Sequence, residues 1–155
     1  MEFRKLSGAL TVSPQIAAAD VAALKQAGFK SIVCHRPDGE GADQPLFREI
    51  EEAARAAGLD ARYQPVVSGR MSDADAAAFG DLMQGLPKPV FAFCRTGTRS
   101  ASLWALSEAK SRTLPDILER TRAAGYDMTD IVRRIANGGR APTDITHEIV
   151  TLSKG

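Results

Sequence analysis

Short apolar runs alternate with longer amphipathic segments along most of the chain. Runs of the kind that form buried strands lie at residues 10–12, 30–34, 61–67 and 89–93. The last of these, PVFAF, is the most apolar and is therefore expected at the centre of a sheet. Pro65 lacks the N–H that a strand ladder needs, which favours an edge position for the third run.

Helix-forming segments separate these runs and follow the last of them. They are expected at residues 13–27, 46–57, 72–83, 100–110, 114–124 and 127–136, and the pattern after Gly138 is ambiguous. Ser13 and Pro14 suit an N-cap and a first helical turn, and glycines at positions 28 and 58 suit the ends of the first two helices. Strands alternating with helices predict an α/β fold with a central, mainly parallel sheet flanked by helices, in one domain over residues 1–155.

Composition and charge narrow the classes of function that fit this chain. Its net charge is +1, which does not favour a polyanion such as nucleic acid as a partner. No apolar run approaches the ~18 residues of a membrane span, and the first residues do not read as a signal peptide. Two cysteines cannot form a disulfide scaffold, so both are expected to be reduced thiols in a cytoplasmic protein. Cys34, His35, Cys94 and His147 are too scattered for a metal site, and we expect neither a metal nor another cofactor.

The segment CRTGTRS, residues 94–100, joins the most apolar run to a predicted helix. In such a strand-to-helix turn, the N–H groups of the loop and of the first helical turn point at one place and favour an anion there. Gly97 permits the positive φ or the close backbone approach that the turn requires, and Arg99 offers two parallel donors to an oxyanion. Cys94 would lie in this field, which favours its thiolate, and it is the predicted nucleophile with Arg99 as its catalytic partner.

The rest of this loop is predicted to bind the substrate or its anionic group, through Arg95, Thr96, Gly97, Thr98 and Ser100. Of these, the Ser100 hydroxyl is placed to donate to the thiolate or to the leaving group. The alternative interpretation is that Cys94 is a small buried apolar residue followed by a polar turn. A glycine three positions later, an arginine five positions later and the helix that follows favour the nucleophile.

A second loop, CHRPDGEGADQP, follows the predicted strand at residues 30–34. Because parallel strands end at the same edge of a sheet, this loop is expected to face the cysteine loop. Arg36 is predicted to bind the anionic end of a substrate, and Asp38 or Glu40 to orient Arg99. A surface turn is the alternative, because the Pro-Asp-Gly sequence of the loop suits one.

Cys34 and His35 are interpreted mainly as structural residues. Cys34 is expected in the core, and His35 in a loop or held by hydrogen bonds. The alternatives are that Cys34 resolves an oxidised Cys94 and that His35 acts as a base.

These motifs resemble those of two families of cysteine enzymes. Protein-tyrosine and dual-specificity phosphatases have C-x5-R, usually with a histidine before the cysteine, where this chain has Phe93. Single-domain rhodaneses often have C-R-x-G-x-R-S, which matches the four residues between Cys94 and Arg99. The segments GALTVSPQI, AGFKSIVCHRPDGEGADQP and YQPVVSG resemble the dual-specificity phosphatase fold. Together, residues 6–136 resemble the bacterial family of the beta-lactamase-hydrolase-like protein, phosphatase-like domain.

The resemblance implies a cysteine-phosphatase-like fold with a loop of rhodanese length. The family is also labelled a sulfur transferase and is associated with sulfide-oxidation proteins. It therefore implies a small thiol or sulfane-sulfur substrate and sulfide-oxidation enzymes as partners. Neither nucleic acid nor a membrane is expected as a partner.

Two features bear on whether the cysteine attacks sulfur or phosphorus. A loop that is one residue shorter makes a smaller cradle, which would crowd three phosphoryl oxygens but would hold a terminal sulfur. The acid that such phosphatases carry after the strand YQPVV is missing, because this chain has Ser68, Gly69 and Arg70 there and Asp73 is expected to cap a helix. A thiolate or sulfite leaving group needs no strong acid, whereas an alkoxide does.

The predicted function is therefore that of a rhodanese-type sulfurtransferase. Cys94 takes sulfane sulfur from a donor such as glutathione persulfide or thiosulfate, and the Cys94 persulfide passes it to a thiol or to sulfite. One alternative is a cysteine-dependent phosphatase of the protein-tyrosine or dual-specificity kind, acting through a phosphocysteine. The other is a non-catalytic module that binds an anion or a partner.

Overall fold

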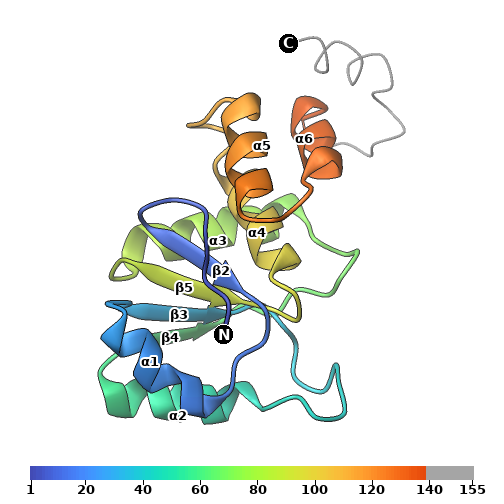
Figure 1. Ribbon diagram of the computed structural model, residues 1–155. Helices are drawn as coiled ribbons and strands as arrows, with labels where there is room; N and C mark the ends of the chain where they lie inside the picture. The colour runs from blue at the N-terminus through green and yellow to red at the C-terminus, as the bar shows by residue number, and fades with distance from the viewer. Residues whose placement is uncertain (139–155) are drawn as a thin grey trace.

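A five-stranded sheet forms the centre of the computed structural model, which describes residues 1–138 (Figure 1). The strands are, in spatial order, β1 (Arg4–Lys5), β2 (Leu10–Ser13), β5 (Val90–Phe93), β3 (Ser31–Cys34) and β4 (Asp60–Tyr63). Strands β2, β5, β3 and β4 run parallel, whereas β1 pairs antiparallel with β2. The sheet is mainly parallel, with β5 at its centre and β4 at an edge, as the sequence predicts.

Helices cover both faces of this sheet. They are η1 (Ala18–Asp20), α1 (Val21–Gln26), α2 (Phe47–Ala57), α3 (Asp73–Gly85), α4 (Thr98–Ser107), α5 (Leu114–Ala123) and α6 (Thr129–Ala136). Helices α1 and α2 lie on one face and α3 and α4 on the other, while α5 and α6 pack beside α4 (Figure 1). Within residues 1–138, every helix falls short of the length and hydropathy that crossing a membrane requires. The predicted α/β architecture with flanking helices is confirmed.

The central strand β5 contributes to two cores at once. Successive strand residues point to opposite faces of a sheet. Val90 and Ala92 accordingly belong to the core under α3 and α4, and Phe91 and Phe93 to the core under α1 and α2. All four are fully buried, which explains why this run is apolar without alternation.

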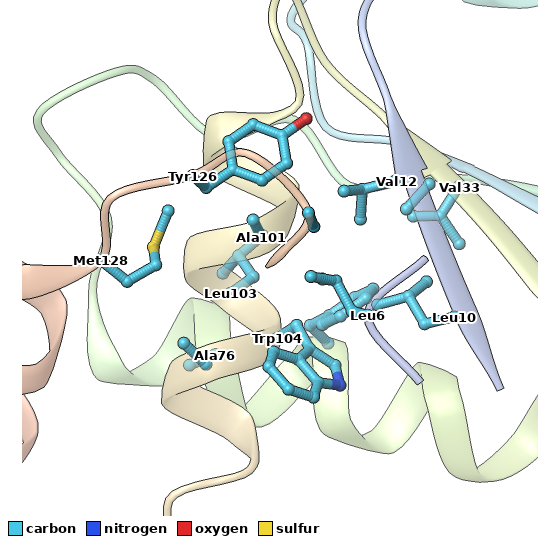
Figure 2. Packing of buried hydrophobic residues seen from close by; sticks show 14 of the residues in the cluster. Leu6, Leu10, Val12, Val33, Ala76, Ala101, Leu103, Trp104, Tyr126 and Met128 are labelled. Carbon is cyan, nitrogen blue, oxygen red and sulfur yellow. The ribbon is translucent and has the colours of Figure 1, made fainter. Parts of the chain in front are cut away.

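The larger core also anchors α4. Figure 2 shows Ala101, Leu103 and Trp104 of this helix packed with residues of the sheet and with Tyr126 and Met128, which follow α5. All are buried. The start of α4, and with it the loop that carries Cys94, is therefore fixed by apolar packing on several sides.

The first helix begins later than the sequence predicts. Residues 14–17 form a loop before η1, so the predicted helix over residues 13–27 is wrong in its first part. The Asp20 carboxylate accepts a hydrogen bond from the backbone N–H three residues earlier, at 2.8 Å, where helical structure starts. The Gln15 N–H instead donates to the Arg95 carbonyl oxygen at 3.2 Å. This segment thus supports the cysteine loop.

Two features of the sheet differ from the prediction. The strand expected at residues 61–67 ends at Tyr63, ahead of Pro65, which has no N–H to donate. The short strand β1 was not predicted, because two residues are too few for an apolar pattern to reveal.

The predicted helix ends are close to those observed, and the starts differ by up to two residues in the second half of the chain. Helix α4 begins two residues earlier than predicted, because Gly97 is its left-handed N-cap. Helix α6 begins two residues later, because the Asp127 carboxylate accepts a hydrogen bond from the Thr129 N–H at 3.0 Å. The ambiguous pattern after Gly138 lies outside the described residues.

Replacing Phe91 by alanine is expected to lower the free energy of unfolding by about 3–5 kcal/mol. The ring is fully buried and contacts the ring of Phe29 edge-on, with centroids 5.3 Å apart. Urea denaturation followed by circular dichroism measures the loss. Val67→Ala is the control, because this side chain is exposed and its removal is expected to change stability by less than about 0.5 kcal/mol. Equal losses in both variants would contradict the assigned core.

Candidate active site

The cysteine loop lies where the central strand ends and α4 begins. Cys94 directly follows β5, and the loop is held from the side of β2 by two backbone hydrogen bonds. The Cys94 N–H donates to the Ser13 carbonyl oxygen at 3.4 Å, and the Gln15 N–H donates to the Arg95 carbonyl oxygen at 3.2 Å. The start of the loop is thus fixed at the carboxyl edge of the parallel strands, where ligands of such sheets bind.

The Cys94 thiol lies at the base of this loop and is fully buried. The Gly97 N–H donates to Cys94 Sγ at 3.1 Å. The first N–H groups of α4 have no partner within the helix, and the helix dipole places positive potential at this end. The loop and the start of α4 thus have the geometry that the sequence predicts for an anion site.

Gly97 is required here for two reasons. Its φ of +92° lies in the left-handed region, which side chains rarely adopt. A Cβ at this position would also collide with the Tyr126 hydroxyl and lie 3.3 Å from the Ser13 carbonyl carbon. The sequence predicts either a positive φ or a close backbone approach, and the structure has both.

Glu40 binds the two arginines that the sequence places at the site. Arg99 Nη1 and Nη2 donate to the two Glu40 carboxylate oxygens at 2.8 and 2.7 Å, and Arg36 Nε donates to Glu40 Oε1 at 3.0 Å. Arg99 Nη1 also donates to the Val66 carbonyl oxygen at 2.9 Å. Both arginines are 9% exposed. Glu40 therefore lies where the sequence predicts an acid that orients Arg99.

These contacts determine which groups are charged. The hydrogen bonds from Arg99, aided by Arg36, lower the pKa of Glu40 from its ordinary 4.5 to about 2. The bond to Glu40, with a further contribution from Cys94, raises the pKa of Arg99. Glu40 is therefore ionised at neutral pH and has no proton to donate to a leaving group.

Asp38, the other acid predicted to orient Arg99, has different partners. Its carboxylate accepts a hydrogen bond from the Phe47 N–H at 2.9 Å, at the start of α2. Its own N–H donates to the Tyr63 hydroxyl at 2.8 Å. Asp38 thus holds the second loop against α2 and β4. This is a structural role, as expected if the Pro-Asp-Gly sequence forms a surface turn.

Ser100 and His35 form a buried hydrogen-bonded chain that sequence patterns did not reveal. The Gln64 side-chain amide donates to the Asp75 carbonyl oxygen at 2.9 Å, which turns its oxygen towards His35 Nε2 at 3.1 Å. His35 Nδ1 then accepts from the Ser100 hydroxyl at 2.7 Å. Burial lowers the pKa of His35 to about 3, so the ring is neutral. The Ser100 proton is thereby directed at His35, whereas the sequence predicts a donor to the thiolate.

Cys34 is buried on the face of the sheet that packs against α1 and α2. Its Sγ donates to the Arg36 carbonyl oxygen at 3.4 Å, and burial raises its pKa to about 12. At neutral pH it is a thiol, which fits the core interpretation. Within residues 1–138, His, Cys, Asp and Glu side chains form no group of three or more that could hold a metal ion.

An open cavity of about 620 Å³ lies above the cysteine loop. Its walls bring together residues of the cysteine loop, of the second loop and of the segment after β4, among them Arg36, Glu40, Val67, Ser68, Arg95, Thr96, Thr98 and Arg99. Glu40 is the one carboxylate among the described residues that line it. Asp73, at the start of α3, instead pairs with Arg134 at 2.8 Å, and Ser72 is the N-cap.

Replacing Gly97 by alanine is expected to cost about 1–3 kcal/mol of stability from the left-handed backbone and a further loss from the collision with Tyr126. Gly58→Ala is a matched control, because Gly58 has φ of +80° with nothing within 4 Å of its added Cβ. Thermal unfolding should show a larger drop for the variant at position 97. Equal drops in the two variants would show that Tyr126 does not press on the loop.

The Glu40→Gln substitution is expected to make stability less dependent on acid pH. The folded pKa of Glu40 is depressed, so its ion pairs stabilise the fold fully above about pH 4.5, and this contribution is lost as the pH falls towards 2. The melting temperature of the wild type should thus exceed that of Glu40→Gln at pH 7 and approach it near pH 2. Glu51→Gln, which breaks an exposed pair with Arg55, is the control. A constant gap from pH 7 to pH 2 would contradict the assigned pairing.

Sequence comparison connects these features to a known family. The chain matches the family described as beta-lactamase hydrolase-like protein, phosphatase-like domain, over residues 2–111. It is 36% identical over 135 residues to the beta-lactamase hydrolase-like protein of Agrobacterium fabrum, an alignment that covers 86% of this chain and 31% of that relative. The chain thus spans less than a third of the length of this curated relative.

Solved structures show the same relationship. A candidate phosphatase of Neisseria meningitidis Z2491 is 35% identical with a TM-score of 0.80, and the match covers 90% of this chain and 99% of that one. A candidate phosphatase of Shewanella putrefaciens CN-32 is 19% identical with a TM-score of 0.68, covering 90% and 93% of the two chains, a likeness that shows the fold alone. The fold is thus that of cysteine phosphatases. Because the family match spans most of its length, the chain belongs to the beta-lactamase hydrolase-like protein, phosphatase-like domain family.

Proposed function

We propose that the Cys94 site is that of a phosphatase-like enzyme which hydrolyses small phosphate monoesters through a phosphocysteine. The observation that carries this proposal is the thiol of Cys94 at the base of an anion cradle, with the Gly97 N–H on its sulfur at 3.1 Å. The 35% identity to the Neisseria meningitidis structure described as a candidate phosphatase supports the same chemistry.

The proposed reaction has two steps at this cradle. Cys94 attacks the phosphorus atom, and the bond to the leaving oxygen breaks while the loop N–H groups and Arg99 hold the phosphoryl oxygens. Water then hydrolyses the phosphocysteine, which releases inorganic phosphate and restores the thiol. Glu40 keeps the Arg99 guanidinium in a fixed orientation through two hydrogen bonds, and a third bond goes to the Val66 carbonyl oxygen. The Arg99 Nε–H group and one Nη2–H group are left for the anion.

The choice of leaving group follows from the absence of a protonated acid among the described residues that line the cavity. Glu40, the one carboxylate in the described lining, is ionised and bound to two arginines. With no protonated acid at hand, esters of acidic alcohols such as phenols are the favoured substrates, because their leaving oxygen needs little proton transfer. Aryl phosphates are therefore expected to react faster than alkyl phosphates.

Sulfur transfer is the second candidate, and one observation favours it specifically. Only four residues separate Cys94 from Arg99, one fewer than in the phosphatase pattern, and a smaller cradle suits a terminal sulfur better than a phosphoryl group. In this reaction Cys94 attacks the outer sulfur of a persulfide or of thiosulfate, a thiolate or sulfite leaves, and a second thiol takes the sulfur from the Cys94 persulfide. The relatives named above are described as phosphatase-like or hydrolase-like, so they do not support this predicted function.

Steady-state assays of both reactions with the same protein separate the candidates. The phosphatase proposal predicts turnover of p-nitrophenyl phosphate that Cys94→Ser lowers by at least about a thousandfold. Cys34→Ala, which removes the other thiol, is expected to leave that rate largely unchanged. Turnover of thiosulfate or glutathione persulfide alone would overturn the proposal in favour of sulfur transfer. Turnover of neither by folded protein would leave an anion-binding or partner-binding module.

A further inference from the structure

Tyr126 lies against the cysteine loop although it is distant in sequence. It belongs to the connection between α5 and α6, beyond residues 2–111 that match the family. Its hydroxyl donates to the Thr96 carbonyl oxygen at 3.1 Å, and the same hydroxyl occupies the space that a Cβ on Gly97 would need. Figure 2 shows the ring beside Ala101 near the start of α4, with the hydroxyl directed away from Met128.

The Tyr126 ring is itself held in place. The Arg4 guanidinium lies over the ring, 5.3 Å from its centroid, and Arg4 Nη1 donates to the Ala124 carbonyl oxygen at 2.8 Å. The side chain is 8% exposed. Burial raises the pKa of Tyr126 to about 12, so the phenol keeps its proton and acts as a donor.

The hydrogen bond from Tyr126 acts on the peptide unit that contacts the nucleophile. The Thr96 carbonyl and the Gly97 N–H belong to one planar peptide unit, and in a trans peptide these two groups point in opposite directions. Tyr126 binds the carbonyl end, and Cys94 Sγ accepts from the N–H end at 3.1 Å. Holding the carbonyl towards Tyr126 therefore aims the N–H at the sulfur atom.

This restraint matters because the peptide could otherwise turn. Gly97 has no side chain to limit rotation of the peptide units beside it. Turning the Thr96–Gly97 unit over would point a carbonyl oxygen at Cys94, which would repel a thiolate and a bound anion. A hydrogen bond to the carbonyl also polarises the peptide and strengthens the bond from its N–H.

We propose that Tyr126 is a positioning residue for the Cys94 nucleophile, which holds the Thr96–Gly97 peptide with its N–H on the sulfur atom. The inference rests on the proposed function only in taking Cys94 as the reacting group. It assigns a role at the site to the α5–α6 connection, and it applies to phosphoryl and sulfur transfer alike.

Tyr126→Phe tests this role, because it keeps the ring and removes only the hydroxyl. Alkylation of Cys94 is measured by mass spectrometry of its peptide, with neutral iodoacetamide and anionic iodoacetate from pH 5 to pH 10. We expect the rate at pH 7 to fall about fivefold, as for the loss of one hydrogen bond, and the midpoint of the pH profile to rise. The preference for iodoacetate over iodoacetamide should fall as well.

Thr129→Ala is the matched control for the stability of the α5–α6 connection. Thr129 bonds to the Asp127 carboxylate in the same segment, and these hydrogen bonds do not involve the cysteine loop. It should lower the melting temperature without moving the alkylation profile. The proposal is overturned if Tyr126→Phe alkylates like the wild type, or if Thr129→Ala shifts the profile equally. Alkylation of Cys94 does not require catalytic turnover. The role of Tyr126 can therefore be tested even if the protein turns over neither phosphate esters nor sulfur donors.

Discussion

The turn from β5 into α4 is packed tightly between neighbouring segments, and the geometry of the site depends on this close packing. It is closed on one side by the end of β2, whose Ser13 carbonyl oxygen receives the Cys94 N–H, and on the other by Tyr126. Glycine at position 97 fits between them because it accepts a positive φ and has no Cβ to collide with either neighbour. The tight turn brings the sulfur atom, the loop N–H groups and the start of α4 together. An anion bound there meets donors that the fold has already oriented.

The charges around this turn determine which substrates and leaving groups suit the site. Two nearly buried arginines share one carboxylate, so the walls of the cavity keep a net positive charge that suits an anionic substrate. The same sharing keeps Glu40 ionised, which removes the acid that an alkoxide leaving group would require. The neutral His35 and Ser100 face one another and add no charge. These charges fit the proposed substrate, an anionic ester with a good leaving group.

Much of this arrangement follows from local patterns in the sequence. The apolar run PVFAF predicted the central strand, and the spacing of Cys94, Gly97 and Arg99 predicted a loop that wraps an anion site. The shared edge of parallel strands correctly placed the second loop beside the first, and of the two acids predicted there to orient Arg99, Glu40 is the one that binds it. The predictions of the central strand and of the neighbouring second loop succeed because strand polarity and turn chemistry depend on residues close together in the sequence.

Contacts between distant segments were not predictable in this way. The sequence has no signal that separates Glu40 from Asp38 as the partner of Arg99, because both lie in a turn with suitable carboxylates. Tyr126 carries no motif, and only the packing of α5 and α6 on α4 brings it to the cysteine loop. The late start of the first helix likewise depends on a backbone contact, from Gln15 to the cysteine loop.

In both proposed reactions, Cys94 becomes covalently bonded to the transferred group. Rapid quenching with denaturant at mildly alkaline pH during turnover, where a phosphocysteine is more stable than in acid, allows the Cys94 peptide to be analysed by mass spectrometry. With an aryl phosphate, we expect an adduct with the mass of one phosphoryl group on Cys94 and on no other residue. An unmodified Cys94 peptide throughout turnover of an aryl phosphate, persulfide or thiosulfate substrate would contradict it.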